Sequence, residues 1–465
     1  MCLSMTIGRV SKLWAAAISA MFASALVGGA AAASRPFAHA RTLTADSNAD
    51  DESEWWWYLL IPVLSGIVGW ATNVLALKMT FYPIEFFPSF MSWSQIPGQP
   101  VSYFLLAGWQ GIIPSKADKM AQIMTELITT SLIDIQETFE KLNPAKMAAE
   151  LREGVEPAIA RVIEDVAMAE MRSAWIATPP HVKQEINAAA AEHIEEFVVG
   201  FVKEMQVNIY EVFDIVGMNV RLARERKDKI VHMFQVVGAQ EFTFIERSGI
   251  YFGFLFGCVQ AAVYAFYKAP WVLPAFGFAV GWMTNYLALL LIFKPVRPRR
   301  VGCFSVHGAF MRRQSEVAET FSDVLVRVFI NADNIWDEIQ HGAKKEKFDH
   351  LLREYTASFV NKTVGVSQLL LGAMVGEEGY KRITARIVDG VVKEFGGFLP
   401  YGYQYSDQAM GIQETLKIKL RALPPEQFEG VLHPAFEEDE IKLILVGGVL
   451  GLAVGLLQEY VMFAS

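Results

Sequence analysis

Two Thr-Asn pairs are the most informative polar residues of this sequence, because each pair interrupts a long apolar segment. Thr72-Asn73 lies in GWATNVLALKMTFYP (69–83), and Thr284-Asn285 lies in GWMTNYLALLLIFKP (281–295). A buried amide or hydroxyl without a hydrogen bond costs about 2 kcal/mol or more, so these four side chains need partners. They can hold helices together, or they can bind a polar substrate.

Each of these two roles predicts its own geometry. In the packing role, one asparagine bonds the other across the interface of two related helices, or caps the backbone at a helix break. In the pathway role, the four residues line a polar route at a repeat interface, as in many transporters. The first three apolar segments contain no Asp, Glu or Arg, which disfavours a proton-coupled pump.

No other pattern predicts an active site, so we expect neither an enzyme nor a cofactor. Metalloprotease, dinucleotide-binding and Walker-type motifs do not occur in the sequence. Cys2, Cys258 and Cys303 are far apart and lack the spacing of a metal site. The acidic run 437–440 is most simply the cap of a helix start. A formal charge of −9 argues against nucleic acid as a partner.

The elements that position the Thr-Asn pairs are predicted membrane spans. Only 20% of the residues are charged, and the apolar residues gather in four segments. About 20 helical residues cross the hydrocarbon core of a bilayer. Trp55, Trp56, Trp57 and Tyr58 form an aromatic belt where the first segment begins. The spans are predicted over residues 55–80, 249–267, 271–293 and 441–463.

The first and third spans are similar enough to indicate a tandem duplication. Residues 69–83 and 281–295 align without a gap and share nine of fifteen positions, including Trp, Thr-Asn and Pro. Downstream, Gly111–Ala121 and Gly308–Ala318 keep the same spacing. Such self-similarity has to be recognised before a fold is assigned. Each copy then consists of a span, a polar domain and a second span.

Both polar domains are predicted to be helical, so the fold class is all-α: a four-span bundle with two long helical domains on one side. The domains cover residues 83–247 and 294–440. In the first, apolar residues at three- and four-residue steps predict one long amphipathic helix from Val182 to Val216. Because a pair of spans returns the chain to its starting side, both domains lie on the same face. Basic residues beyond the third span place that face in the cytoplasm, matrix or stroma.

Small residues recur four positions apart in every span, which predicts close helix packing in lipid. The residues in this pattern are Ser65, Gly69, Gly249, Gly253, Gly257, Gly277, Gly281, Gly447, Gly451 and Gly455.

Residues 1–45 have the composition of a targeting segment. They contain no Asp or Glu, and Arg9 and Lys12 precede an Ala-rich apolar stretch. This layout is typical of a secretory signal peptide, while the Ser/Arg/Ala-rich remainder also suits an organellar transit sequence, and an uncleaved signal anchor is the third alternative. The sequence fits a multi-pass protein of an endomembrane, the plasma membrane or an organellar membrane.

The motifs together resemble the domain-of-unknown-function 445 family of multi-pass membrane proteins. The resemblance rests on residues 69–83, on GIIPSKADKMA (111–121) and on FEGVLHPAFEEDEIKLILVGGVLGLAVGLLQ (428–458). In the second copy, Met311 replaces the proline that the first copy has at Pro114, so that motif is only partial there. The resemblance implies a multi-pass protein with a helical interior and brings no catalytic residues.

A scaffold or tether is the function that the sequence favours. Most of the chain beyond residue 45 is polar helix outside the membrane, and such helices bind a protein partner, each other or the bilayer surface. The alternative is a transporter, channel or lipid-translocating protein that acts through the repeated Thr-Asn spans. Four spans make a narrow bundle, so that alternative would require a homodimer.

Overall fold

The structure is a computed structural model that describes residues 55–87, 110–267, 269–301, 304–364, 367–432 and 440–463. The predicted targeting segment and most of the acidic run 437–440 lie outside these residues. The chain divides into two compact units. Unit 1 comprises Met1–Ala76, Phe244–Ala288 and Ile441–Ser465, and unit 2 comprises Leu77–Thr243 and Leu289–Glu440.

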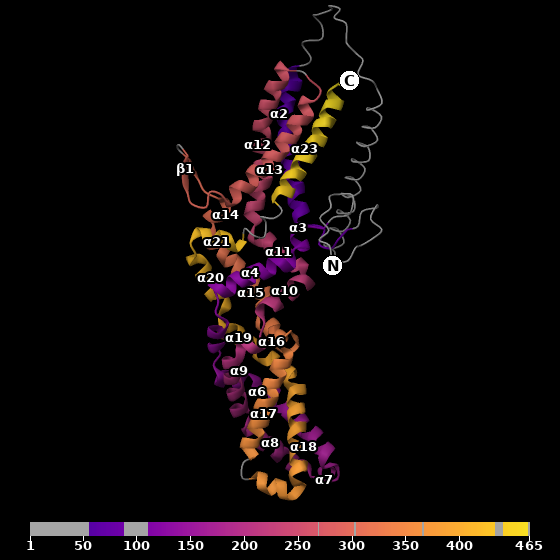
Figure 1. Ribbon diagram of the computed structural model, residues 1–465, viewed down its shortest axis with the longest axis vertical. Helices are drawn as coiled ribbons and strands as arrows, with labels where there is room; N and C mark the ends of the chain where they lie inside the picture. Colours follow the sequence, from indigo (N-terminus) through magenta and orange to yellow (C-terminus); the bar gives the residue numbers. More distant parts are fainter. Residues whose placement is uncertain are drawn as a thin grey trace, which may run out of the picture. The chain divides into compact units, whose positions relative to one another are not determined.

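Unit 1 is built from four long apolar helices, which run side by side in Figure 1. They are α2 (Trp55–Phe81), α12 (Ala239–Phe266), α13 (Val272–Phe293) and α23 (Glu440–Phe463). Their apolar stretches of 21 to 28 residues are long enough to cross a membrane. These helices fall on the four predicted segments, so the structure supports a membrane protein with four candidate spans.

The helix α12 begins earlier than the predicted span, which was placed where the charged residues end. Its first turns carry Glu241, Glu246 and Arg247 before the apolar stretch starts. A helix continues past an apolar segment wherever the backbone hydrogen bonds can continue, so hydropathy alone misplaces its first residue. Near the other end of α12, Tyr264 is buried with Ile61, Val272 and Leu273 in an apolar cluster.

Unit 2 is helical throughout most of its described residues. Its helices from the first inter-span region are α3 (Ile112–Ser115), α4 (Ala117–Ser131), α5 (Ile135–Glu140), α6 (Pro144–Glu170), α7 (Arg172–Ala177), α8 (Pro180–Glu192), α9 (Ile194–Val212), α10 (Ile215–Glu225) and α11 (Lys227–Val237). Those from the second are α14 (Ala309–Arg312), α15 (Gln314–Val328), α16 (Ala332–His341), α17 (Lys345–Val364), α18 (Ser367–Phe398), α19 (Pro400–Met410), α20 (Ile412–Ala422) and α21 (Pro425–Leu432).

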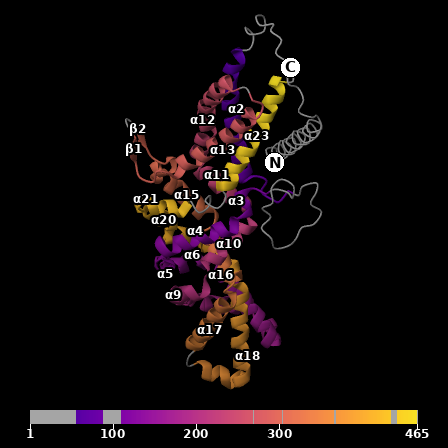
Figure 2. The same cartoon turned by 45° about the horizontal axis from the view of Figure 1, so that its top comes forward.

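Helices from both inter-span regions share one hydrophobic core in unit 2. The helix α6 packs against α18 and α19 as well as against α9, and α17 packs against both α9 and α18. Figure 2 shows α17 beside α18. At their meeting point the Phe201 ring lies 5.5 Å from that of Phe395 and 6.2 Å from that of Phe348. Aromatic pairs at these distances are favourable and bury a large area. The two predicted polar segments therefore interleave.

The long amphipathic helix predicted from Val182 to Val216 is wrong, because the structure divides this segment among α8, α9 and α10. The first helix ends at Glu192, and the second ends at Val212, before Phe213, whose backbone is extended. Asp214 then starts α10, and its side chain accepts a hydrogen bond from the Gly217 amide. A short acidic residue competes for backbone donors and so favours a new helix start over a continuous helix.

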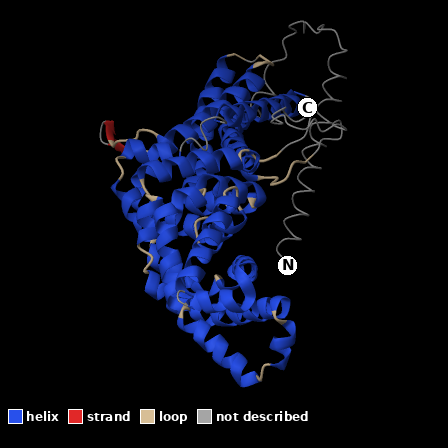
Figure 3. Cartoon of the chain, turned by 60° about the horizontal axis from the view of Figure 1, so that its bottom comes forward, coloured by secondary structure: helices blue, strands red, loops and turns tan. Residues whose placement is uncertain are grey.

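A two-stranded antiparallel hairpin follows α13 and contains β1 (Arg299–Val301) and β2 (Phe304–Val306), drawn as strands in Figure 3. Arg299 is paired with Val306, and Val301 is paired with Phe304. The sequence predicted no strand here, because three-residue strands are too short to show an alternating pattern.

Candidate functional site

The predicted Thr-Asn site lies where pairs of helices approach closely, and the first such pair is α2 with α12. A Cβ atom at Gly69 would overlap the carbonyl oxygen of Gly249, and a Cβ atom at Gly257 would lie 2.6 Å from the Cα of Pro62. Gly253 likewise faces the backbone of Ser65. Residues four apart lie on one helix face, so a column of small side chains lets the two backbones touch.

The second pair, α13 with α23, has the same construction. A Cβ atom at Gly281 would overlap the carbonyl oxygen of Gly447, and one at Gly451 would overlap that of Gly277. Gly455 faces Leu273 in the same way. All nine glycines predicted as packing residues therefore lie against the neighbouring helix of their pair.

Each asparagine donates a hydrogen bond to a backbone carbonyl of the helix beside it. The Nδ2 of Asn73 lies 2.7 Å from the Ile245 oxygen, and the Nδ2 of Asn285 lies 2.8 Å from the Leu443 oxygen. Both side chains are buried, with 0% and 4% of Asn73 and Asn285 exposed. Each of these bonds holds together the helices of one pair, and neither of them joins one asparagine to the other.

The neighbouring threonines are satisfied within their own helices. The Thr72 hydroxyl donates to the Gly69 carbonyl at 3.0 Å, and the Thr284 hydroxyl donates to the Gly281 carbonyl at 3.2 Å. Bonds of this kind to the preceding turn occupy the hydroxyl and keep it from other partners. The threonine hydroxyls therefore form their hydrogen bonds within their own helix, whereas the asparagine amides form hydrogen bonds between helices.

Three buried amide atoms of these spans have no hydrogen-bond partner among the described residues. They are the Oδ1 atoms of Asn73 and Asn285 and the Nε2 of Gln260. Gln260 is 1% exposed, and its Oε1 accepts a bond of 2.9 Å from the Ser65 hydroxyl. Amides do not titrate, so this group can accept or donate hydrogen bonds and cannot transfer protons. Sequence reasoning missed Gln260, although a lone glutamine in an apolar span was a visible signal.

A buried ion pair in unit 2 was also missed. The Arg313 guanidinium lies 2.7 Å from the Glu241 carboxylate, which is 2% exposed, and 2.8 Å from that of Glu316. Removing one partner of a buried pair leaves an uncompensated charge, which costs far more than the pair itself contributes. The contact therefore fixes the start of α12 against the start of α15.

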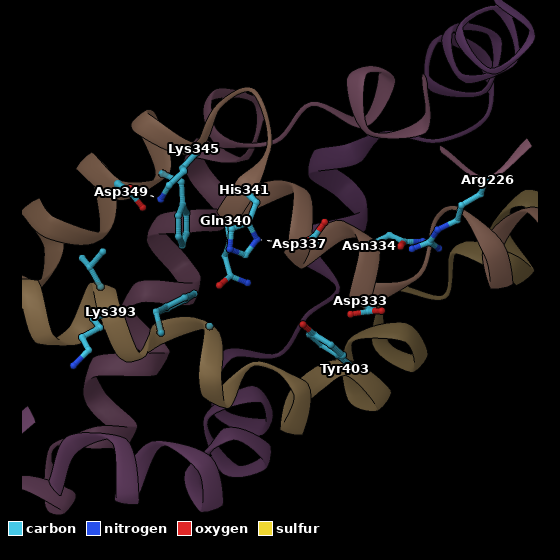
Figure 4. Close-up of a pocket in the computed structure, with 14 residues that line it drawn as sticks. Arg226, Asp333, Asn334, Asp337, Gln340, His341, Lys345, Asp349, Lys393 and Tyr403 are labelled. Atoms are coloured by element: carbon cyan, nitrogen blue, oxygen red, sulfur yellow. Dashed lines mark hydrogen bonds and ion pairs between the residues drawn. The ribbon is translucent and has the colours of Figure 1, made fainter. Parts of the chain in front are cut away.

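Unit 2 also contains a polar cavity of about 510 Å³, shown in Figure 4. Its walls carry charges of both signs above an apolar floor of Phe348, Phe395 and Val392. The polar lining residues are Arg226, Asp333, Asn334, Asp337, Gln340, His341, Lys345, Asp349, Lys393 and Tyr403. The volume is within the range of small-molecule sites, about 300–1,000 Å³.

Most charges of the cavity already have partners. Asp337 accepts from the Nδ1 of His341 at 3.0 Å and from Arg221 at 3.1 Å, and Lys345 lies 2.6 Å from Asp349. Burial raises the pKa of the Tyr403 phenol, and the nearby Asp333 and Asp337 carboxylates raise it further. A phenol held neutral in this way is a hydrogen-bond donor and a poor base. The described residues include no group of His, Cys, Asp and Glu that could hold a metal ion.

Comparison with known proteins identified no relative of this chain. No family model, no curated protein and no solved structure matches the chain.

Proposed function

We propose that this protein is a membrane-anchored scaffold or tether, in which the four apolar helices hold unit 2 at the membrane surface. The observation that carries the proposal is that unit 2 combines both inter-span segments in one helical body. A body of this kind offers a large surface to a protein partner or to the bilayer. Neither the cavity nor the Thr-Asn pairs contains a nucleophile beside a base, which an enzyme of the common hydrolytic classes would need.

Packing within unit 2 supports the placement of both inter-span segments on one side of the membrane. The Leu151 side chain of α6 reaches to within 3.0 Å of the position that a Cβ would take at Gly402 of α19. A bilayer cannot separate segments in such contact. The basic residues after α13 favour the cytoplasm, matrix or stroma for this side.

Membrane-impermeant labelling of single cysteines tests this sidedness. Cysteines at the exposed positions Lys203 and Arg382 should react from the same side of sealed vesicles. Reaction of the two positions from opposite sides would overturn the shared placement.

Equivalent contacts in the two helix pairs support our proposal that the chain is a tandem duplication. Asn73 and Asn285 are paired in the sequence alignment, and each bonds a carbonyl one turn before a glycine that faces it, Gly249 or Gly447. We propose membership of the domain-of-unknown-function 445 family on the motifs of residues 69–83, 111–121 and 428–458.

The scaffold proposal is tested by photo-crosslinking in intact cells. Val207 on α9 is an apolar side chain that is 73% exposed, so it is accessible to an external partner. A photoreactive residue at position 207 should form a reproducible adduct with a protein or a lipid. A photoreactive residue at the exposed His350 is the control. If position 207 yields no adduct beyond that of position 350, and purified protein binds no partner, the scaffold proposal fails.

Transport through the spans is the second candidate, because the Oδ1 atoms of Asn73 and Asn285 are buried without a partner among the described residues. A passing polar group or a homodimer interface would satisfy them. Replacing both asparagines by leucine should then abolish flux in reconstituted vesicles while assembly persists. Flux that survives the double substitution excludes this candidate.

A further inference from the structure

The segment after α13 carries an unusual concentration of positive charge. Residues 294–313 contain six Lys or Arg residues and no Asp or Glu. The corresponding segment of the first copy, residues 82–116, contains Glu85 and a single basic residue, Lys116. Because the chain as a whole is acidic, with a formal charge of −9, this segment differs in sign from the rest. Its charge therefore requires its own explanation.

Two of the six cations are neutralised within unit 2. Arg297 lies 2.6 Å from the Glu426 carboxylate, and Arg313 lies 2.7 Å from that of Glu241. The other four are Lys294, Arg299, Arg300 and Arg312, which we call the basic collar. All four are exposed, and among the residues that the structure describes no carboxylate lies within 4.0 Å of them. The collar is thus free to bind an external anion.

The chain itself limits how far the collar can lie from the end of α13. This helix ends at Phe293, Lys294 follows directly, and Arg299 begins β1 only six residues later. A fully extended chain advances about 3.3–3.6 Å per residue, so Arg299 lies within about 20 Å of the helix end. If α13 crosses the bilayer, Lys294, Arg299 and Arg300 lie at the level of the lipid head groups or just outside them. A hydrogen bond of 3.0 Å from the Gly308 amide to the Pro295 carbonyl returns the segment that leads to Arg312 toward the same place.

We propose that the basic collar binds the anionic phospholipid head groups of the leaflet that α13 leaves. Phosphate groups are the charges that this position offers at the highest density, and arginine matches them with two parallel donors. Basic residues clustered beside a span bind anionic lipid surfaces through the same attraction. Arg299 and Arg300 both lie on β1, and the pairing of this strand with β2 orders the backbone of this part of the collar in advance. The inference rests on the membrane anchoring of the proposed function and names a partner for this part of the surface.

Native mass spectrometry of the full-length protein in non-ionic detergent tests the collar. The probes are phosphatidylglycerol and phosphatidylcholine with the same acyl chains, titrated separately. A basic residue beside an anionic surface contributes about fivefold in affinity, so Arg299→Gln with Arg300→Gln should weaken phosphatidylglycerol binding about 25-fold. Binding of phosphatidylcholine should stay unchanged. Arg299→Lys with Arg300→Lys should retain most of the binding, because the lipid surface attracts either cation.

A matched control is available in the same unit. Arg172 and Lys203 are exposed cations distant in sequence from any span, and Arg172→Gln with Lys203→Gln removes the same charge. This control should leave the lipid affinities as they are. Inorganic phosphate at millimolar concentration should not displace the lipid, because a free anion lacks the apolar anchorage of a lipid.

Three results would overturn the inference: equal phosphatidylglycerol affinity in wild type and the glutamine variant, equal loss in the control variant, or displacement of the lipid by inorganic phosphate. Extraction of cell membranes with alkaline carbonate separates this failure from that of the tether. Release of the protein by carbonate refutes membrane anchoring itself. Retention after carbonate, combined with unchanged lipid affinity, refutes the collar alone.

Discussion

The side-chain amide of Asn73 donates a hydrogen bond of 2.7 Å to the carbonyl oxygen of Ile245 on the adjacent helix. Asn285 bonds Leu443 in the same manner at 2.8 Å. Each carbonyl already belongs to a helix, and that of Ile245 also accepts from the Ser248 hydroxyl at 2.8 Å, so the asparagine adds a further donor to an oxygen that is already hydrogen-bonded. One asparagine side chain thus ties together each pair of helices, whose backbones already touch through glycine.

Replacement of Asn73 by leucine should destabilise the α2–α12 pair by about 1 kcal/mol, because a polar contact between membrane helices contributes about that much. Asn285→Leu should have a similar effect on the α13–α23 pair. The free energy of unfolding in detergent, followed by circular dichroism during denaturant titration, measures the loss. Tyr286→Leu is the control, since that side chain is 40% exposed and adjacent in sequence. Wild-type stability in both asparagine variants would show that the bonds add nothing.

The glycines of the helix pairs should tolerate no side chain. Gly69→Ala or Gly281→Ala should lower the free energy of unfolding by about 1–3 kcal/mol, because the new methyl group meets a backbone carbonyl that cannot rotate away. The same denaturant titration measures this change.

A matched pair of glycines serves as the control for these substitutions. A Cβ at Gly397 of α18 or Gly430 of α21 would have no atom within 4 Å. Alanine at either position should stabilise the protein by about 0.4–1 kcal/mol, because it restricts the unfolded chain. If the free energy of unfolding rises in all four alanine variants, at Gly69 and Gly281 as well as at Gly397 and Gly430, the packing described for the spans is contradicted.

The predictable part of this fold is its local part. Apolar length indicated the four long helices, and glycine spacing indicated which faces would meet, because both depend on residues a few positions apart. The Thr-Asn pairs were visible as interruptions in apolar sequence. Their partners Ile245 and Leu443 were not predictable, because a backbone carbonyl as acceptor carries no side-chain signature.

The arrangement of unit 2 depends on contacts between distant residues, which one sequence does not reveal. Nothing in α6 indicates that it packs against α18, or that Arg313 would find Glu241. The end of α8 at Glu192 follows no proline or glycine, so the periodic pattern runs through it undisturbed. The polar cavity combines side chains from α16, α17, α18 and α19, and only the tertiary fold brings these together.

The start of α5 should make unit 2 sensitive to acid. Asp134 accepts bonds from the amides of Glu137 and Gln136 and from the Tyr210 hydroxyl, and these lower the pKa of its carboxyl below 3.8. A depressed pKa stabilises the folded state above the unfolded pKa, and this contribution is lost as the pH falls through the folded value. Asp134→Asn should therefore reduce the dependence of the unfolding free energy on pH below about pH 4.

The second inter-span segment provides the control for this experiment. Asn331 caps α16 by accepting from the Asn334 amide at 2.9 Å, and an asparagine cap does not titrate. Asn331→Asp should add acid sensitivity, in the opposite direction to Asp134→Asn. Denaturant titrations at pH 7, 4 and 3 measure both, and parallel pH profiles for all three proteins would contradict the assignment.

The interleaved core predicts that damage to one inter-span segment spreads to the other. Leu151 of α6 is 3% exposed and packs toward Gly402 of α19, so Leu151→Ala should cost about 2–5 kcal/mol through the cavity that it leaves. Hydrogen exchange should then accelerate in α18 and α19 as well as in α6, because these helices share one core. Glu150→Ala, at an exposed neighbouring position, should leave exchange unchanged. Acceleration confined to α6 and α9 would mean that the two segments unfold separately, and a single cooperative body would then be the wrong description of unit 2.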